Sequence, residues 1–337
     1  MNTPAIVARQ LTKDYSIADR GDGLRGSLRT LAGRRTTKVR AVDDVSFEIP
    51  RGAIVGFLGP NGAGKSTTIK MMTGIIRPDT GDVSVLGVDP ARQRIRNAQQ
   101  IGVVFGQRSQ LSWDVPVRES LRLVASIYGV TRADTESVIA SAAAELELGP
   151  LLAKPTRQLS LGQKMRCEIA AALIHRPPVV YLDEPTIGLD VQVKELIRGY
   201  LQRINREFGT TIVLTTHDMG DVEALCQSVL VIDAGRVVFD GAIHDLKDTV
   251  EPRRTVIFRR SSGWSEGIVE ELNAVLPDGA RVEEAQDAVL TVVLDPLTTT
   301  SGRVVSAVAS RYESDEVSVH EPTIEAVVRQ IYAGALA

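Results

Sequence analysis

The chain has 337 residues, of which 43% are hydrophobic and only 4% aromatic, so it is long enough for one full domain and a smaller one, each with an aliphatic core. Its formal net charge of −3 argues against nucleic-acid binding. No uninterrupted apolar run approaches the roughly 20 residues of a membrane span, and the first residues lack the pattern of a signal peptide. We therefore expect a cytosolic chain whose two cysteines are buried thiols, and whose membrane role, if any, depends mainly on a partner.

The chain begins with a strand-like segment at residues 5–11, whose mixed composition is typical of a sheet edge. The segment 16–40 then differs in composition, because seven basic residues face only two acidic ones. Within it Leu24, Leu28 and Leu31 recur at the spacing of one helix face. Two interpretations of this basic insert stay open: a short amphipathic helix that lies against anionic lipid or a membrane protein, and a flexible loop.

The most specific pattern follows a short apolar strand at residues 53–58. It consists of Gly59, Pro60, Asn61, Gly62, Ala63, Gly64, Lys65, Ser66 and Thr67. In this phosphate-loop spacing, glycines let consecutive N–H groups curl around phosphate oxygens, the lysine brings a positive charge to the β- and γ-phosphates, and the serine hydroxyl reaches Mg²⁺. A helical pattern follows, with its N-terminus aimed at the anion. An ordinary glycine-rich turn would lack this context, so the sequence predicts binding of a nucleoside triphosphate.

A second carboxylate element ends the apolar run at residues 179–182. Asp183 is placed to hold Mg²⁺ directly or through water, and Glu184 could polarise a water for in-line attack on the γ-phosphate. Between the two elements, the pattern at residues 117–172 is mostly helical. From about residue 251, strand and helix patterns alternate in an order that suggests a small α+β domain, with a ferredoxin-like arrangement as one possibility.

The residues Leu159-Ser160-Leu161-Gly162-Gln163 resemble the signature sequence of ATP-binding cassette (ABC) ATPases, in which a glycine usually stands where this chain has Leu161. Alone, the segment is better explained as a helix N-cap at Ser160, but in order with the other motifs it is specific. The remaining family positions are matched by Gln107 in the Q-loop, Asp190 in the D-loop (with Ile187 where serine or threonine is usual), His217 as the switch histidine and, mainly by position, Tyr15 as the aromatic residue that stacks on adenine.

This resemblance covers roughly residues 5–241 and implies a RecA-like, P-loop α/β core with an inserted helical subdomain at about 108–176. Together with the change of pattern near residue 251, it divides the chain into a nucleotide-binding domain at 1–250 and a C-terminal accessory or regulatory domain at 251–337. It also implies head-to-tail dimers, in which the ATP site of one copy is closed by Ser160 and Gly162 of the other. In each site, the family assigns Mg²⁺ to Ser66, Gln107 and Asp183, catalysis to Lys65, Glu184 and His217, and further nucleotide contacts to Tyr15, Gln163, Asp190 and the loop residues 59–67.

Within the family, the phosphate loop, the segment 183–190 and the C-terminal extension look like the exporter branch that includes daunorubicin-resistance-type and polysaccharide-exporter ATPases. We therefore expect an ATP-hydrolysing exporter subunit on the cytoplasmic face of the membrane. It would be peripheral there, work with separate permease subunits, pair with a second copy and bind no nucleic acid. Two alternatives stay open: an importer ATPase with a substrate-sensing C-terminal domain, and a soluble mechanical ATPase of translation or DNA repair. The soluble machine is less favoured, because the chain has one cassette and no long coiled coil between Lys65 and Asp183.

Overall fold

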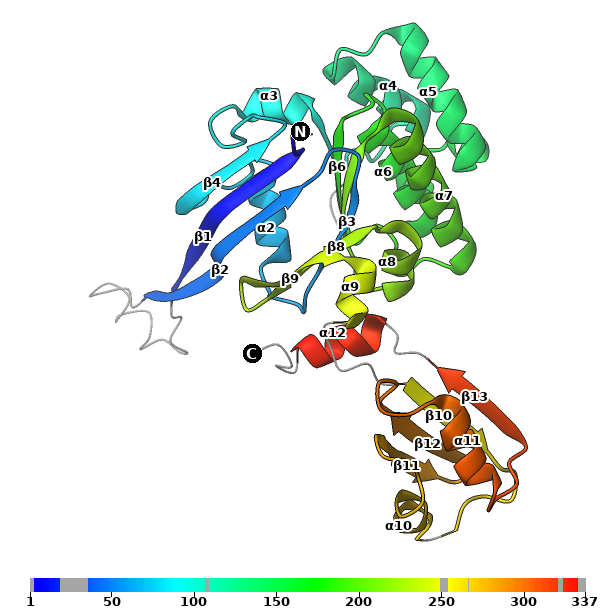
Figure 1. The fold of residues 1–337 in the computed structure, drawn as a ribbon. Helices are drawn as coiled ribbons and strands as arrows, with labels where there is room; N and C mark the ends of the chain where they lie inside the picture. The colour runs from blue at the N-terminus through cyan, green and yellow to red at the C-terminus, as the bar shows by residue number, and fades with distance from the viewer. Residues whose placement is uncertain are drawn as a thin grey trace, which may run out of the picture. The chain divides into compact units, whose positions relative to one another are not determined.

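The computed structural model describes residues 3–18, 36–106, 109–248, 254–265, 267–320 and 324–332. The chain divides into two compact units, Met1–Ile243 and His244–Ala337 (Figure 1). The division falls at the start of the short helix α9 (Ile243–Asp248). None of the helices in the described ranges has both the length and the apolar character needed to cross a membrane.

A six-stranded sheet forms the centre of the first unit, in the order β5-β6-β7-β3-β8-β9. Its strands are β3 (Ile54–Leu58), β5 (Ile101–Phe105), β6 (Val179–Asp183), β7 (Thr211–Thr215), β8 (Ser228–Asp233) and β9 (Arg236–Ala242). All neighbouring strands run parallel except β8 and β9. Because parallel strands end at the same edge of a sheet, the segments that follow β3, β6 and β7 converge at one place.

A three-stranded antiparallel sheet, in the order β2-β1-β4, shares the hydrophobic core of the central sheet. Its strands are β1 (Ile6–Ala18), β2 (Thr36–Ile49) and β4 (Thr80–Val85). The expectation of an edge strand at residues 5–11 is wrong, because β1 pairs with β2 on one side and with β4 on the other. The two ends of the basic insert are thus parts of β1 and β2, whereas its leucines lie outside the described residues.

Helices separate the strands of the first unit. They are α2 (Lys65–Met72), α3 (Arg94–Gln99), α4 (Val117–Ile127), α5 (Arg132–Glu145), α6 (Leu161–Leu173), α7 (Val191–Phe208) and α8 (Met219–Leu225), with single 3-10 turns at Gly149–Leu151 and Thr156–Gln158. Three of them, α4, α5 and α6, lie between the neighbouring strands β5 and β6 in the chain (Figure 1). They form the inserted helical subdomain that the sequence predicts.

The second unit contains a four-stranded antiparallel sheet in the order β11-β12-β10-β13. Its elements are β10 (Arg254–Arg259), α10 (Ile268–Asn273), β11 (Ala280–Gln286), β12 (Val289–Leu294), α11 (Ser301–Ala309) and β13 (Glu316–His320), followed by α12 (Ile324–Tyr332). This β-α-β-β-α-β order with its sheet order is the ferredoxin-like arrangement. Alternate residues of β10 and β12, such as Phe258 and Val292, are fully buried in its core.

Candidate functional site

The phosphate loop lies where the chain turns from the buried strand β3 into helix α2. Gly64 has a φ of 107°, in the left-handed region, and a Cβ there would collide with the carbonyl oxygen of Ala41. A Cβ at Gly59 would collide in the same way with the carbonyl oxygen of Ile232. Helix α2 begins without a side-chain cap, so the N–H groups of its first turn are available to an anionic ligand.

Lys65, the first residue of α2, folds back over the loop that precedes it. Its Nζ donates to the carbonyl oxygen of Gly59 at 2.5 Å and to that of Pro60 at 3.0 Å. Burial lowers the pKa of Lys65, while the negative charges of Glu184 and Asp183 act in the opposite direction. The ammonium group therefore lies in the field of the two carboxylates that the sequence assigns to metal binding and catalysis.

Two neighbouring parallel strands end in residues that bond to each other. Asp183, the last residue of β6, is in register with Thr215, the last residue of β7. The Thr215 hydroxyl donates to Oδ1 of Asp183 at 2.6 Å, and the backbone N–H of Glu184 donates to the carbonyl oxygen of Thr215 at 3.0 Å. One threonine thus fixes both carboxylate residues at the edge of the sheet.

Glu184 has an unusual backbone conformation. Its φ of 53° lies in the left-handed region, which is unfavourable for a residue with a side chain and is a form of strain found at functional sites. Its Oε1 lies 3.0 Å from Nδ1 of His217, within hydrogen-bonding distance. The imidazole of His217 is 68% exposed, whereas Glu184 is 26% exposed. The strand-tip carboxylate and the histidine after β7, far apart in the sequence, are thus brought together.

A cavity of about 560 Å³ opens beside these groups. It is lined by Tyr15, Ser66, Lys70, Ile75, Ile76, Phe105, Gly106, Asp183, Glu184 and Ile187. Four of these are positions that the sequence assigns to the site: Tyr15 to nucleotide binding, Ser66 and Asp183 to metal binding, and Glu184 to catalysis. An aromatic ring, a hydroxyl at a helix N-terminus and two carboxylates therefore line the same space, together with apolar side chains.

Comparison with known proteins identifies the family. The family described as ABC transporter matches residues 42–187. The daunorubicin resistance ATP-binding protein DrrA3 of Streptomyces coeruleorubidus is 30% identical over 305 residues, which cover 88% of this chain and 92% of that protein. The chain belongs to the ATP-binding proteins of ABC transporters. As a member of this family it binds ATP and is an ATPase, as the sequence predicts.

Two further proteins of the ABC family are similar to this chain, one in sequence and one in structure. The methionine import ATP-binding protein MetN of Latilactobacillus sakei is 34% identical over 309 residues, which cover 88% of this chain and 85% of that protein. The structure of cbiO1 from Clostridium perfringens, part of the ABC transporter complex cbiONQ, is 25% identical with a TM-score of 0.60 and covers 81% of this chain and 96% of that one. The predicted fold class, a mixed α/β ABC cassette, is confirmed.

The signature residues of this ABC ATPase form the start of helix α6. The Ser160 hydroxyl accepts from the Gln163 N–H at 3.3 Å, and the Ser160 N–H donates to Oε1 of Gln163 at 3.2 Å, so the two residues form a reciprocal cap. Asp190 caps α7 in a similar way, by accepting from the Val193 N–H at 2.9 Å. Ser160, Gly162, Gln163 and Asp190 do not line the cavity of their own chain. Gln107 lies outside the described residues.

Sequence reasoning missed several groups at this site. Thr215, the partner of the two carboxylates, belongs to none of the motifs, although its position at the end of an apolar run, like that of Asp183, is a usable signal. Lys70 and the apolar residues Ile75, Ile76 and Phe105 line the cavity without belonging to any motif. Their positions depend on how α2 and β5 pack, which no local pattern encodes.

Proposed function

We propose that this chain is the ATP-hydrolysing subunit of an ABC exporter, and that two copies close on each other when ATP and Mg²⁺ bind. The observation that carries the proposal is that Tyr15, Ser66, Asp183 and Glu184 line the same cavity. The exporter assignment is supported by the similarity to DrrA3. The matched region of 305 residues is longer than the first unit, so it includes part of the second unit. In this proposal the first domain spans residues 1–250, and the domain at 251–337 assists or regulates assembly.

The phosphate loop and Lys65 would hold the β- and γ-phosphates. The loop N–H groups and the uncapped start of α2 supply donors, and Lys65 supplies the charge once it exchanges a loop carbonyl for a phosphate oxygen. The Ser66 hydroxyl and the Asp183 carboxylate, which line the same cavity, are the oxygen ligands that Mg²⁺ prefers, and Gln107 would complete the set. When bound, Mg²⁺ neutralises phosphate charge during transfer.

Glu184 would act as the general base, by accepting a proton from the water that attacks the γ-phosphate. Its hydrogen bonds to Thr215 and its strained backbone hold the carboxylate at the tip of β6. His217, which is within hydrogen-bonding distance of Glu184, would contact the γ-phosphate. Because His217 is largely exposed, it can reorient between Glu184 and the phosphate without disturbing the core.

The second copy would complete each site. Ser160 and Gly162 lie at the N-terminus of the 13-residue helix α6, outside the cavity of their own chain, and a helix N-terminus stabilises anions. Closure of the pair would then act on separate membrane permease subunits, with the ATPase peripheral on the cytoplasmic face. ATP can bias the permease only through its higher affinity for the closed state.

A Glu184→Gln variant tests this proposal, because it keeps the size of the side chain and removes the base. In the presence of ATP and Mg²⁺, we expect it to sediment as a dimer, and to return to monomers when the nucleotide is removed. Glu283→Gln, which changes an exposed carboxylate on β11, is the matched control and should hydrolyse ATP normally. A Glu184→Gln protein that stays monomeric, or that turns over ATP at the normal rate, contradicts the mechanism.

The similarity to MetN favours a second candidate, an importer ATPase whose ferredoxin-like unit senses the substrate. This candidate predicts that a free amino acid such as methionine binds the full chain and inhibits its ATPase activity. The exporter proposal predicts no such effect. Titrating the purified chain with methionine while measuring phosphate release distinguishes the two transport candidates.

A third candidate, the soluble mechanical ATPase, is tested separately. Recovery of the chain together with a permease from membranes would exclude it.

A further inference from the structure

Tyr15 lies on a part of β1 that does not follow a regular ladder with β2. The register between the two strands shifts three times between Ala8 and Asp14. Gln10 and Asp44, on opposite strands, both have a positive φ, of 50° and 55°. Beyond the shifts, residues 14–18 and 36–40 continue as a paired extension, here called the arm. Because bulges bend and twist a strand pair, the backbone ladder alone leaves the direction of the arm weakly fixed.

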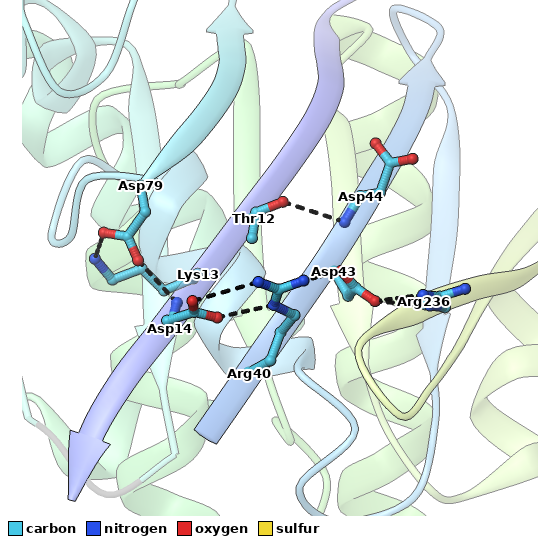
Figure 2. A network of polar contacts seen from close by, with 8 residues as sticks. All are labelled: Thr12, Lys13, Asp14, Arg40, Asp43, Asp44, Asp79 and Arg236. Carbon is cyan, nitrogen blue, oxygen red and sulfur yellow. Dashed lines mark hydrogen bonds and ion pairs between the residues drawn. The ribbon is translucent and has the colours of Figure 1, made fainter. Parts of the chain in front are cut away.

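A network of ion pairs holds the arm at this point (Figure 2). The Arg40 guanidinium donates to Oδ1 of Asp14 at 2.9 Å and to Oδ1 of Asp43 at 3.0 Å. Arg236 on β9 donates to the other oxygen of Asp43 at 2.8 Å. On the opposite side of Asp14, its backbone N–H donates to Asp79 at 2.8 Å, just before β4. Asp14, the residue next to Tyr15, is thus held by contacts from the β2 side and from the β4 side of strand β1.

The same network reaches the phosphate loop through the backbone. The Asp43 N–H donates to the carbonyl oxygen of Gly235 at 2.8 Å, and the Gly235 N–H donates to the carbonyl oxygen of Ala63 at 3.0 Å. Ala41, two residues before Asp43, lies so close to Gly64 that only a glycine fits there. A continuous series of polar contacts therefore runs from Asp14, beside Tyr15, to Ala63 in the loop.

We propose that Arg40 and Asp43 are positioning residues of the nucleotide site, which hold Tyr15 at a fixed distance from the phosphate loop. A nucleoside triphosphate contacts both ends at once, so its base stacks well only if this distance is fixed. The inference rests on the proposed function, in which Tyr15 stacks on adenine. Ion pairs of this kind are weak when exposed. Arg40 is 54% exposed, but the two carboxylates that it bonds are less so, with Asp43 18% and Asp14 28% exposed.

Calorimetric titration of the full chain with two ligands tests the proposal. One is a nonhydrolysable ATP analogue, and the other is tripolyphosphate, which lacks the base. We expect Arg40→Ala to weaken binding of the ATP analogue about three- to tenfold, and to leave tripolyphosphate binding unchanged. Tyr15→Ala should show the same pattern with a larger loss, of roughly tenfold or more. Once Tyr15→Ala is in place, adding Arg40→Ala should cost nothing further, because Arg40 acts through Tyr15.

The matched control is Arg122→Ala, which removes an arginine that likewise bonds two carboxylates, Glu136 and Glu119, but in the helical subdomain. It should change neither affinity. Asp43→Asn, which keeps the size of the side chain, is a second variant in case Arg40→Ala folds poorly. An equal loss for both ligands, or a full Arg40 effect without Tyr15, overturns the inference. If Tyr15→Ala itself leaves the affinity for the ATP analogue unchanged, the adenine contact of the proposed function fails as well.

Discussion

The two units of this chain use their sheets in opposite ways. In the first unit the neighbouring parallel strands β6 and β7 end in polar residues, so that Asp183 and Thr215 meet beside the loop that follows β3. In the second unit the strands are antiparallel, and alternate residues such as Phe258 and Val292 fill a core. A parallel sheet collects its connections at one edge and suits chemistry, whereas this antiparallel sheet provides an apolar face for two helices. Substitutions should therefore affect catalysis in the first unit and stability in the second.

Among substitutions that test this difference between the units, we expect the largest effect from Phe258→Ala in the second unit. Phe258 is fully buried, and its truncation should lower the free energy of unfolding of that unit by about 3–5 kcal/mol. Binding of ATP by the first unit should persist. Denaturation followed by circular dichroism, with a parallel nucleotide titration, measures both. Val319→Ala on the exposed side of β13 is the control, and a matching loss of ATP binding in Phe258→Ala would mean that the units are not independent.

Next in size is Lys65→Ala in the first unit. It removes the cation nearest to the phosphate loop, so ATP hydrolysis should fall about 10²- to 10³-fold while the melting temperature changes little. Phosphate release at saturating ATP measures the effect. Arg94→Ala, an exposed cation on α3, should hydrolyse ATP normally. Activity close to normal after Lys65→Ala would remove the phosphate loop from the proposed mechanism.

A smaller effect is expected from Thr215→Val, which deletes the hydroxyl that bonds Asp183. A hydrogen bond to a charged group contributes roughly 1.5–3 kcal/mol, so we expect kcat to fall about tenfold or more. Thr215→Ser keeps the hydroxyl and should restore most of the activity. If the valine and serine variants are equally active, Thr215 contributes only packing, and the contrast between the two units is weaker than proposed.

The smallest change is Ser160→Ala, which removes the cap of α6 and should cost about 1 kcal/mol of stability. Thr131→Ala removes a comparable cap from α5 and serves as the control. If Ser160 also contacts the nucleotide of a second copy, its loss should weaken the ATP-bound dimer of Glu184→Gln, whereas Thr131→Ala should not. Sedimentation of the two double variants distinguishes the roles, and equal dimerisation would leave Ser160 with capping alone.

The sequence correctly predicts that the two cysteines are buried thiols. Both are buried without a disulfide, and burial raises the pKa of each thiol, Cys167 and Cys226, to about 12.

The strand at residues 5–11 is a case in which the sequence-based prediction is wrong. Its mixed composition is typical of an edge, yet β1 lies between β2 and β4. The composition is mixed because Ile6, Ala8 and Leu11 are buried in the shared core while Arg9 and Gln10 are exposed. Alternation reports which face of a strand is buried, but not how many neighbours the strand has.

The sequence by itself determined the phosphate loop, the second carboxylate element, the helical insertion and the family, because each depends on the chemistry of residues at fixed short spacings. Only the tertiary structure decided that Thr215 joins the two carboxylate residues, that His217 lies beside Glu184 and that Tyr15 lines the same cavity as the two carboxylates. These relations connect residues tens of positions apart, on strands whose order in the sheet differs from their order in the chain. Such contacts arise from packing, which no local pattern of residues specifies.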